Sequence, residues 1–256
     1  MPNMLFVIRD GTMKRIFFVA FFVLLTTGCS VNQTSVVYTD ETSYEKDNLR
    51  FDTRHQPVTG LYRKYGPQMQ LLEEIPYING KIDGTYNVYD EKGIRLLTAQ
   101  YKKGVLHGKT ISYYDSGQQD EIFNYDRGLL HGKQAAFYEN GYLKRKSNYN
   151  HGKKDGLYEE YYANGTIKNS MNFKNGKGNG PARFYNKDSH LVAYTEYVNG
   201  KREGPAFSYY ANDKPKILAY RKNDLLHGAA KEFDTKGNLI GIVTYDNNTV
   251  VNSVKF

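Results

Sequence analysis

Glycine recurs at one fixed spacing through most of this 256-residue chain. It stands at residues 60, 84, 108, 132, 156, 180, 204 and 228, so the spacing of 24 is kept across eight members. When each of these glycines is counted as position 1 of a repeat, position 6 is always aromatic and position 18 is aromatic in seven of the eight repeats. An internal period of this length is typical of repeat architectures, in which each unit is one supersecondary element stacked on its neighbours.

Each 24-residue unit predicts a β-hairpin. Positions 2–7 and 12–18 are rich in aromatic and β-branched residues, and Asn-Gly pairs such as Asn140-Gly141 and Asn164-Gly165 separate them. Gly and Asn supply the positive φ that tight hairpin turns need, whereas three glycines per unit would each cost a helix about 1 kcal/mol. A second, longer turn is expected at positions 19–24. The sequence therefore predicts an all-β fold, an elongated antiparallel β-meander of eight 24-residue hairpin repeats that forms a single-sheet ribbon.

The repeat also predicts two different sheet faces, because side chains alternate across a strand. We expect the aromatic residues of positions 6 and 18 to pack on one face with aliphatic residues at position 12. The other face carries a row of tyrosines at position 7, which are Tyr114, Tyr138, Tyr162 and Tyr210. Such a row either packs between strands or offers rigid, amphipathic contact area to a partner. These four tyrosines form the candidate partner-contact face.

The N-terminal residues predict a targeting segment rather than part of the fold. Met13-Lys14-Arg15 is followed by a ten-residue apolar run over 16–25 and then by small residues up to Gly28, the order found in secretory signal peptides. The apolar run is shorter than the ~20 residues that a spanning helix needs. We predict a signal peptide over 1–28 with Met13 as the better translation start, a polar tether over 29–59, the repeat domain over 60–251 and a C-terminal tail over 252–256.

Composition and charge narrow the class of protein. The chain has 24 Tyr and 13 Phe, too much apolar surface for a disordered chain. Its single cysteine, Cys29, excludes an internal disulfide. The net charge of +8 is spread along the chain without a basic run, which favours a solvated surface over a nucleic-acid site. We expect no nucleic-acid partner.

The histidines at position 24, His107, His131 and His227, raise the question of a metal site. Equivalent atoms in adjacent hairpins lie about 9.6 Å apart, whereas Zn²⁺ ligands lie about 2.0–2.1 Å from the ion. Asp83, Asp155, Asn179 and Glu203 fill the same column in other repeats, so a turn-capping role is the better interpretation. No nucleophile elbow or phosphate-binding loop is found in the sequence. We expect no metal, no cofactor, no small-molecule substrate, no catalytic residue and no enzyme.

The residues before the cysteine, Leu-Thr-Thr-Gly-Cys, resemble the lipobox of bacterial lipoproteins. The resemblance implies cleavage between Gly28 and Cys29 and acylation of Cys29 with groups such as palmitate. Thr26 stands where that family usually has Leu, so a plain secretory signal or an uncleaved anchor is the alternative. Ser30 resembles the residue that directs Gram-negative lipoproteins to the outer membrane. The implied location is the cell envelope, with a lipid anchor, in the outer membrane if the host is Gram-negative.

The repeats resemble bacterial MORN-variant repeats over about residues 58–251. The shared motifs are Gly-x-Tyr-x-x-Tyr, Asn-Gly, Tyr-x-x-Gly and x-x-His-Gly. The resemblance implies a curved antiparallel sheet, and some bacterial members are YwqK-type antitoxins that neutralise a partner toxin. The function it implies is a lipid-anchored protein-protein interaction module, with a toxin or an envelope component as partner. The alternative is a structural envelope protein whose basic sheet binds anionic lipid or cell-wall glycan.

Overall fold

The computed structural model describes residues 36–256, which consist of strands and turns with no helix among them. The chain divides into two compact units between Leu129 and Leu130, called here the N-terminal unit and the C-terminal unit. The predicted all-β fold is confirmed in both units. Among the described residues there is consequently no helix that is long and apolar enough to cross a bilayer.

The N-terminal unit is built from ten strands, and β11 (Leu129–Leu130) falls at the division. The ten strands are β1 (Val37–Tyr38), β2 (Ser43–Lys46), β3 (Leu49–Asp52), β4 (Gly60–Tyr65), β5 (Leu71–Ile78), β6 (Lys81–Ile82), β7 (Gly84–Tyr89), β8 (Arg95–Lys102), β9 (Val105–Tyr113) and β10 (Gln119–Asp126).

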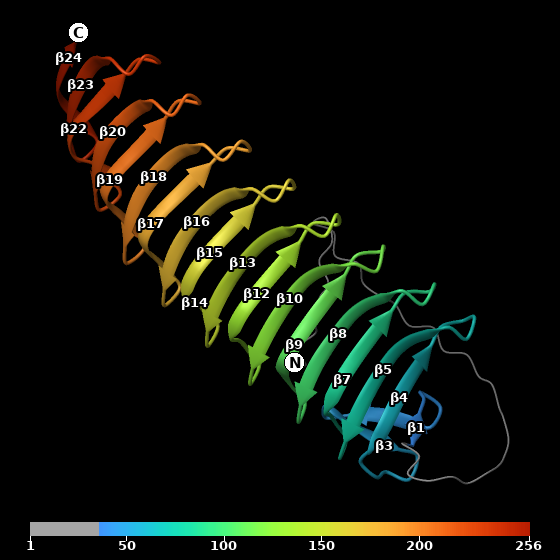
Figure 1. Ribbon diagram of the computed structural model, residues 1–256. Coiled ribbons are helices and arrows are strands. Elements are labelled where there is room, and N and C mark those ends of the chain that lie inside the picture. The colour runs from blue at the N-terminus through green and yellow to red at the C-terminus, as the bar shows by residue number, and fades with distance from the viewer. Residues whose placement is uncertain (1–35) are drawn as a thin grey trace. The chain divides into compact units, whose positions relative to one another are not determined.

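The C-terminal unit continues the same alternation of strands in chain order (Figure 1). Its strands are β12 (Gly132–Phe137), β13 (Leu143–Asn150), β14 (Lys153–Lys154), β15 (Gly156–Tyr161), β16 (Ile167–Lys174), β17 (Lys177–Tyr185), β18 (Leu191–Val198), β19 (Lys201–Tyr209), β20 (Pro215–Lys222), β21 (Leu225–Leu226), β22 (Gly228–Phe233), β23 (Leu239–Asp246) and β24 (Thr249–Lys255).

Each repeat pairs its two long strands antiparallel and also pairs with the following repeat. In the fifth repeat β15 pairs with β16 from Gly156 opposite Phe173 to Tyr161 opposite Ile167, and β13 pairs with β15 of the next hairpin. The register shifts between positions 5 and 6 of every repeat, as between Glu160 and Tyr161, which marks a β-bulge. The predicted meander of antiparallel hairpins is therefore confirmed within each unit.

The prediction that positions 6 and 18 share a face is wrong. The register places position 18 opposite position 1, and position 6 lies five residues further along the strand, so alternation turns it to the other face. Position 18 instead meets position 3: the rings of Tyr158 and Phe173 are 6.0 Å apart, and those of Tyr86 and Tyr101 are 6.3 Å apart. The sequence pattern shows the aromatic columns but not the register that decides which of them face each other.

The two turns of each repeat also differ from the expectation. At Asn140-Gly141 only the glycine has a positive φ, of 83°, and its N–H donates to the Tyr138 carbonyl, which fits a type I turn followed by a glycine bulge. At positions 20 and 21 both residues have positive φ, as in Asn175 (52°) and Gly176 (82°), the φ values of a type I′ turn. The tight two-residue turn thus lies at the opposite end of the hairpin from the Asn-Gly pairs that predicted it.

The backbone conformation at position 1 explains why glycine recurs at the start of every repeat. Gly84, Gly108 and Gly156 have φ of 119°, 99° and 106°, values that residues with a Cβ rarely adopt. At Gly108 a Cβ would lie 2.2 Å from the Oε1 atom of Gln100, which accepts a hydrogen bond of 2.7 Å from the Lys109 N–H. Any side chain here would strain the backbone and displace this bond.

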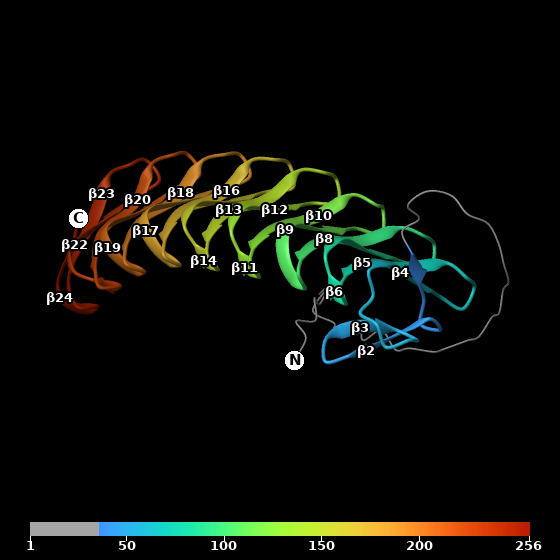
Figure 2. The same cartoon turned by 90° about the horizontal axis from the view of Figure 1, so that it is seen from below.

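Residues 36–59, which the sequence pattern places in the polar tether, instead form an N-terminal cap. Here β2 and β3 pair as an antiparallel hairpin, and β1 pairs in parallel with β4. Figure 2 shows β2 and β3 on one side of β4 and β5. The small core of this unit, which comprises Val58, Tyr62, Ile75 and Tyr77, is buried at this end.

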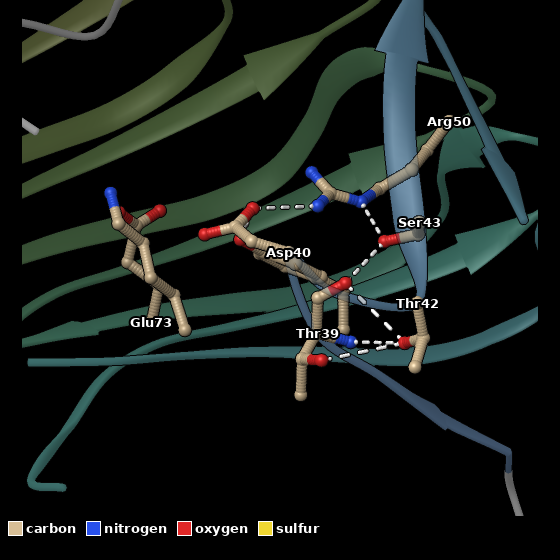
Figure 3. A network of polar contacts seen from close by, with 8 residues as sticks. Thr39, Asp40, Thr42, Ser43, Arg50 and Glu73 are labelled. Carbon is tan, nitrogen blue, oxygen red and sulfur yellow. Dashed lines mark hydrogen bonds and ion pairs between the residues drawn. The ribbon is translucent and has the colours of Figure 1, made fainter. Parts of the chain in front are cut away.

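A polar network around the buried Arg50 explains why the sequence pattern does not predict the cap. The Arg50 guanidinium lies 3.5 Å from the centroid of the Tyr62 ring and donates to Asp40 Oδ1 at 3.0 Å and to Ser43 Oγ at 2.8 Å (Figure 3). The Tyr62 hydroxyl donates to the same Asp40 oxygen at 2.6 Å. Burial and this bond raise the pKa of Tyr62, so its hydroxyl stays a donor. The buried groups, Ser43 and Arg50, are polar and are satisfied by each other and by the exposed carboxylate of Asp40, and such a segment has no apolar period to detect.

The predicted C-terminal tail over 252–256 also differs from the structure. Strand β24 includes Asn252 to Lys255 and pairs antiparallel with β23, from Thr249 opposite Asp246 to Lys255 opposite Gly241. Most of the predicted tail is therefore part of a strand, because β-branched residues continue the pattern past the eighth repeat.

We predict that Gly80→Ala destabilises the N-terminal unit more than Gly93→Ala does. Both glycines have left-handed φ, of 75° and 82°, so each alanine costs about 1–2 kcal/mol of unfolding free energy. A Cβ at Gly80 would also lie 2.9 Å from the Arg50 carbonyl of the cap, whereas a Cβ at Gly93 meets nothing within 4 Å. Overpacking should add about 1–3 kcal/mol at Gly80.

Urea unfolding of the full chain, followed by circular dichroism, measures both variants. Equal losses for the two variants would show that the cap does not pack against Gly80 in solution.

Candidate interaction surface

Three of the four predicted contact tyrosines tie successive repeats together in the C-terminal unit. Tyr138, Tyr162 and Tyr210 each begin the turn that follows the first strand of their repeat. Their hydroxyls donate to the position-6 carbonyl of the next repeat, at 2.8 Å to Tyr161, 2.8 Å to Tyr185 and 2.9 Å to Phe233. The row is therefore in part structural, as one of the two interpretations of the sequence held.

An asparagine two residues later completes each tie. Asn140, Asn164 and Asn212 donate from Nδ2 to the position-8 carbonyl of the next repeat, at 3.1, 3.2 and 2.8 Å. Their Oδ1 atoms accept the position-11 N–H of their own turn, at 3.1, 3.1 and 3.3 Å. The sequence interpretation missed this role. The signal that would have found it is the recurring motif Tyr-x-Asn-Gly, in which Asn and Tyr occur together.

Repeats without a tyrosine at position 7 close the turn differently. Asp90 and Asp234 accept two backbone N–H groups of their own turn, at 2.7–2.9 Å. Hydrogen bonds from Asn238 hold the pKa of Asp234 below its usual value, so it stays a charged acceptor. These turns are closed from within, whereas Tyr138, Tyr162 and Tyr210 reach the next repeat through position 7.

The fourth predicted contact residue, Tyr114, belongs to the N-terminal unit. It follows β9, is half-buried, and its N–H donates to the Gln118 carbonyl at 2.8 Å. The other three, Tyr138, Tyr162 and Tyr210, lie in the C-terminal unit, in the fourth, fifth and seventh repeats.

An exposed lysine at position 13 accompanies each of these three tyrosines. Lys144 Nζ lies 5.7 Å from the centroid of the Tyr138 ring, and Lys216 Nζ lies 5.7 Å from that of Tyr210. Lys168 holds the same position in the repeat of Tyr162 and is also exposed. We call these six residues the Tyr–Lys row. The hydroxyl ties use only the tyrosine oxygens, so the three lysine ammonium groups and the half-buried ring faces do not take part in them. The row therefore presents cationic and aromatic groups on a rigid backbone.

The position-24 column confirms the turn-capping interpretation where it holds an acid or amide. Asp83, Asp155, Asn179 and Glu203 accept the position-20 N–H of the next repeat, at 3.1, 3.1, 3.4 and 2.7 Å. The histidines of this column contact other side chains: His107 and His227 lie 3.3 and 3.4 Å from Asp126 and Asp246. The ring of His131 lies 5.1 Å from that of His151. Over residues 36–256, no three His, Cys, Asp or Glu side chains come together as a metal site.

Cys29 and the predicted cleavage position Gly28-Cys29 lie outside the described residues, as do the signal peptide over 1–28 and the first part of the tether.

We predict that Tyr162→Phe lowers the unfolding free energy of the C-terminal unit by about 1 kcal/mol, because the Tyr185 carbonyl loses its donor. Tyr142→Phe is the matched control, since Tyr142 is 54% exposed in the neighbouring turn, and should change stability by less than about 0.5 kcal/mol. Thermal and urea unfolding measure both. If the two variants lose the same stability, the hydroxyl tie is not formed in solution.

Comparison with known proteins identifies the repeat. The family model described as MORN repeat variant matches residues 130–151, 154–175, 202–223 and 226–247. No curated protein matches the sequence. One solved structure that aligns with it is a porin-like protein from Bacteroides uniformis ATCC 8492, at 8% identity, with 66% of this chain and 86% of that chain covered and a TM-score of 0.19. A score this low carries no argument about fold or function.

The four matched segments lie in the C-terminal unit, where the hairpins and the Tyr–Lys row are found. They bear out the resemblance that the glycine, tyrosine and asparagine columns indicated. Repeats of this kind suggest a protein that interacts with other proteins or with lipid. The chain is therefore a repeat protein that carries MORN-variant repeats within residues 130–247.

Proposed function

We propose that this chain is a lipid-anchored envelope protein whose repeat domain binds a protein partner with an acidic surface through the Tyr–Lys row. The observation that carries the proposal is the recurrence of one tyrosine and one exposed lysine at the same two positions in three repeats of a single unit.

The energetics of the row suit recognition of a protein. A single exposed lysine–carboxylate pair contributes only about 0.2–1 kcal/mol, so the lysines act mainly through orientation and association rate. Tyrosines contribute more, because large rings at interfaces often carry most of the binding energy. The hydroxyl ties hold these rings in place before binding, which lowers the entropy that binding must otherwise cost.

The anchor is proposed from the lipobox-like residues that precede Cys29. An acylated Cys29 would hold the repeat domain at the surface of an envelope membrane, in a Gram-negative host the outer membrane. Restriction to a membrane surface raises the effective concentration of the domain towards an envelope partner. This arrangement suits an interaction module better than a freely diffusing one.

The identity of the partner separates two forms of the proposal. If the partner is a toxin delivered into the envelope, the chain is an immunity protein, and deletion of its gene makes the host sensitive to that toxin. If the partner is an envelope component, deletion changes envelope assembly and not toxin resistance. The same exposed lysines also favour a second candidate, a structural protein that binds anionic lipid or cell-wall glycan.

The first test is capture of partners from the host envelope by the full chain. We expect one stoichiometric protein from the parent chain and at least about tenfold less from a variant in which Lys144, Lys168 and Lys216 are all Gln, since loss of the lysines slows association. The matched control replaces Lys153, Lys177 and Lys201, which are exposed at position 22 of the same unit and give the same change in net charge.

The proposal fails if both triple variants capture the partner equally. Capture of lipid or cell-wall material alone, with a steep salt dependence, would favour the structural role instead.

A separate experiment tests the anchor. We expect the parent chain to incorporate a fatty-acid analogue in its host and to fractionate with membranes, and Cys29→Ser to lose the label, because the thiol is the acylated group. Cys29→Ser that remains labelled would remove the lipoprotein part of the proposal while leaving the interaction surface untouched.

A further inference from the structure

A second cluster lies on the sheet face that carries positions 3, 16 and 18, across β13, β15 and β16. Arg145 is directly opposite Glu160, and Glu160 is directly opposite Asn169. Tyr158 is two residues from Glu160 on β15, so its side chain shares this face. Directly opposed residues share a face, so the polar groups form one line across three strands. The rings of Tyr158 and Phe173 lie beside this line, edge to face at 6.0 Å.

The Glu160 carboxylate is the centre of the cluster. It accepts the Tyr158 hydroxyl at 2.5 Å and the Asn169 amide at 2.7 Å. The hydrogen bond from Tyr158 is the main reason that the pKa of Glu160 lies below its usual value, and Asn169, Lys168 and Arg145 lower it further. The carboxylate is therefore ionised at neutral pH.

Cations exceed anions around this carboxylate. Lys154 Nζ lies 4.3 Å from the centroid of the Tyr158 ring and 5.1 Å from that of Phe173. Burial lowers the pKa of Lys154, and the charge of Arg145 lowers it further, so these two cations are close enough to repel. With Lys168, whose Nζ is 3.8 Å from Glu160 Oε2, three positive charges and one negative charge leave a local charge of +2.

The cluster is confined to the fourth and fifth repeats. Along the same face, Met171 is opposite Ala182, Ala182 is opposite Thr195, and Ala206 is opposite both Thr195 and Ala219. At positions 3 and 16 the following repeats therefore carry small side chains, whereas at position 5 Phe184 lies directly opposite Asn169 and extends the aromatic side of the cluster.

We propose that this cluster, formed by Arg145, Lys154, Tyr158, Glu160, Asn169 and Phe173, binds an anionic saccharide. The face of a sugar ring packs against aromatic side chains, and its hydroxyls exchange hydrogen bonds with planar polar groups such as carboxylate, amide and guanidinium. Arg145 and Lys154 supply the positive charge for the acidic group of the sugar. None of these six residues belongs to the Tyr–Lys row, although Lys168 of that row borders the site through Glu160, and the proposal does not depend on the protein partner proposed above.

The test is calorimetric titration of the full chain, in detergent and at low salt, with trigalacturonate as the probe. Its neutral methyl ester has the same ring and hydroxyls, so it isolates the contribution of charge. We expect trigalacturonate to bind at least about tenfold more tightly than the ester, and Lys154→Gln to lose about tenfold in affinity, the size of one charge-assisted contact. Lys177→Gln, at an exposed position 22 of the fifth repeat outside the cluster, should bind like the parent.

Two further measurements separate a saccharide site from other anion binding. Asn169→Ala removes a hydroxyl-binding group without changing the charge, and we expect it to weaken trigalacturonate but not inorganic phosphate. The proposal is overturned if the methyl ester binds equally, if phosphate or phosphatidylglycerol vesicles bind as tightly as trigalacturonate, or if Lys154→Gln and Lys177→Gln behave alike. Circular dichroism confirms that each variant remains folded, and Lys154→Arg, which keeps the charge, should restore binding.

Discussion

The backbone hydrogen bonds between each hairpin and the next are the interaction on which this structure depends. A hairpin in a single sheet has no second layer to bury it, and few apolar side chains of the described residues are fully buried. Backbone pairing between repeats supplies most of the order. At the tight turns the position-21 N–H of one repeat donates to the position-23 carbonyl of the preceding one, as Gly176 does to Lys154 at 2.7 Å.

Side chains add ties at both ends of the hairpins. Tyr138, Tyr162 and Tyr210 join successive turns at one end, and acids or amides at position 24 join them at the other. Each tie satisfies a carbonyl or N–H that a turn leaves unpaired. Since every tie lies between neighbours, stability is local, as in other repeat proteins. The same feature rigidifies the tyrosine rings that the proposed partner would contact.

The cap shows a different solution to the same problem. The hairpin of β2 and β3 covers the position-3 face of the first repeat, where its buried Arg50 lies over the Tyr62 ring. Glu73, also shown in Figure 3, accepts the Tyr86 hydroxyl at 2.7 Å and the Lys64 ammonium at 3.1 Å. In the fifth repeat a lysine of the preceding repeat, Lys154, lies over the equivalent ring of Tyr158. In that repeat the charged groups on this face are half-exposed.

The sequence by itself determined the repeat length, the all-β hairpin architecture and the capping role of position 24. It could do so because the φ values at position 1, such as 119° at Gly84 and 106° at Gly156, are ones that residues with a Cβ rarely adopt, which leaves glycine as a visible marker. Only the tertiary structure decided which aromatic columns share a face, since that depends on the register between position 1 and position 18. It also decided that residues 36–59 fold, because their buried groups are polar and the partners in the network lie far apart in the sequence, as Arg50 does from Asp40 and Asp40 from Tyr62. The tertiary structure also decided the positions of the lysines in the Tyr–Lys row and the cluster around Glu160. Side chains that meet across strands leave no spacing in the sequence that predicts their contact.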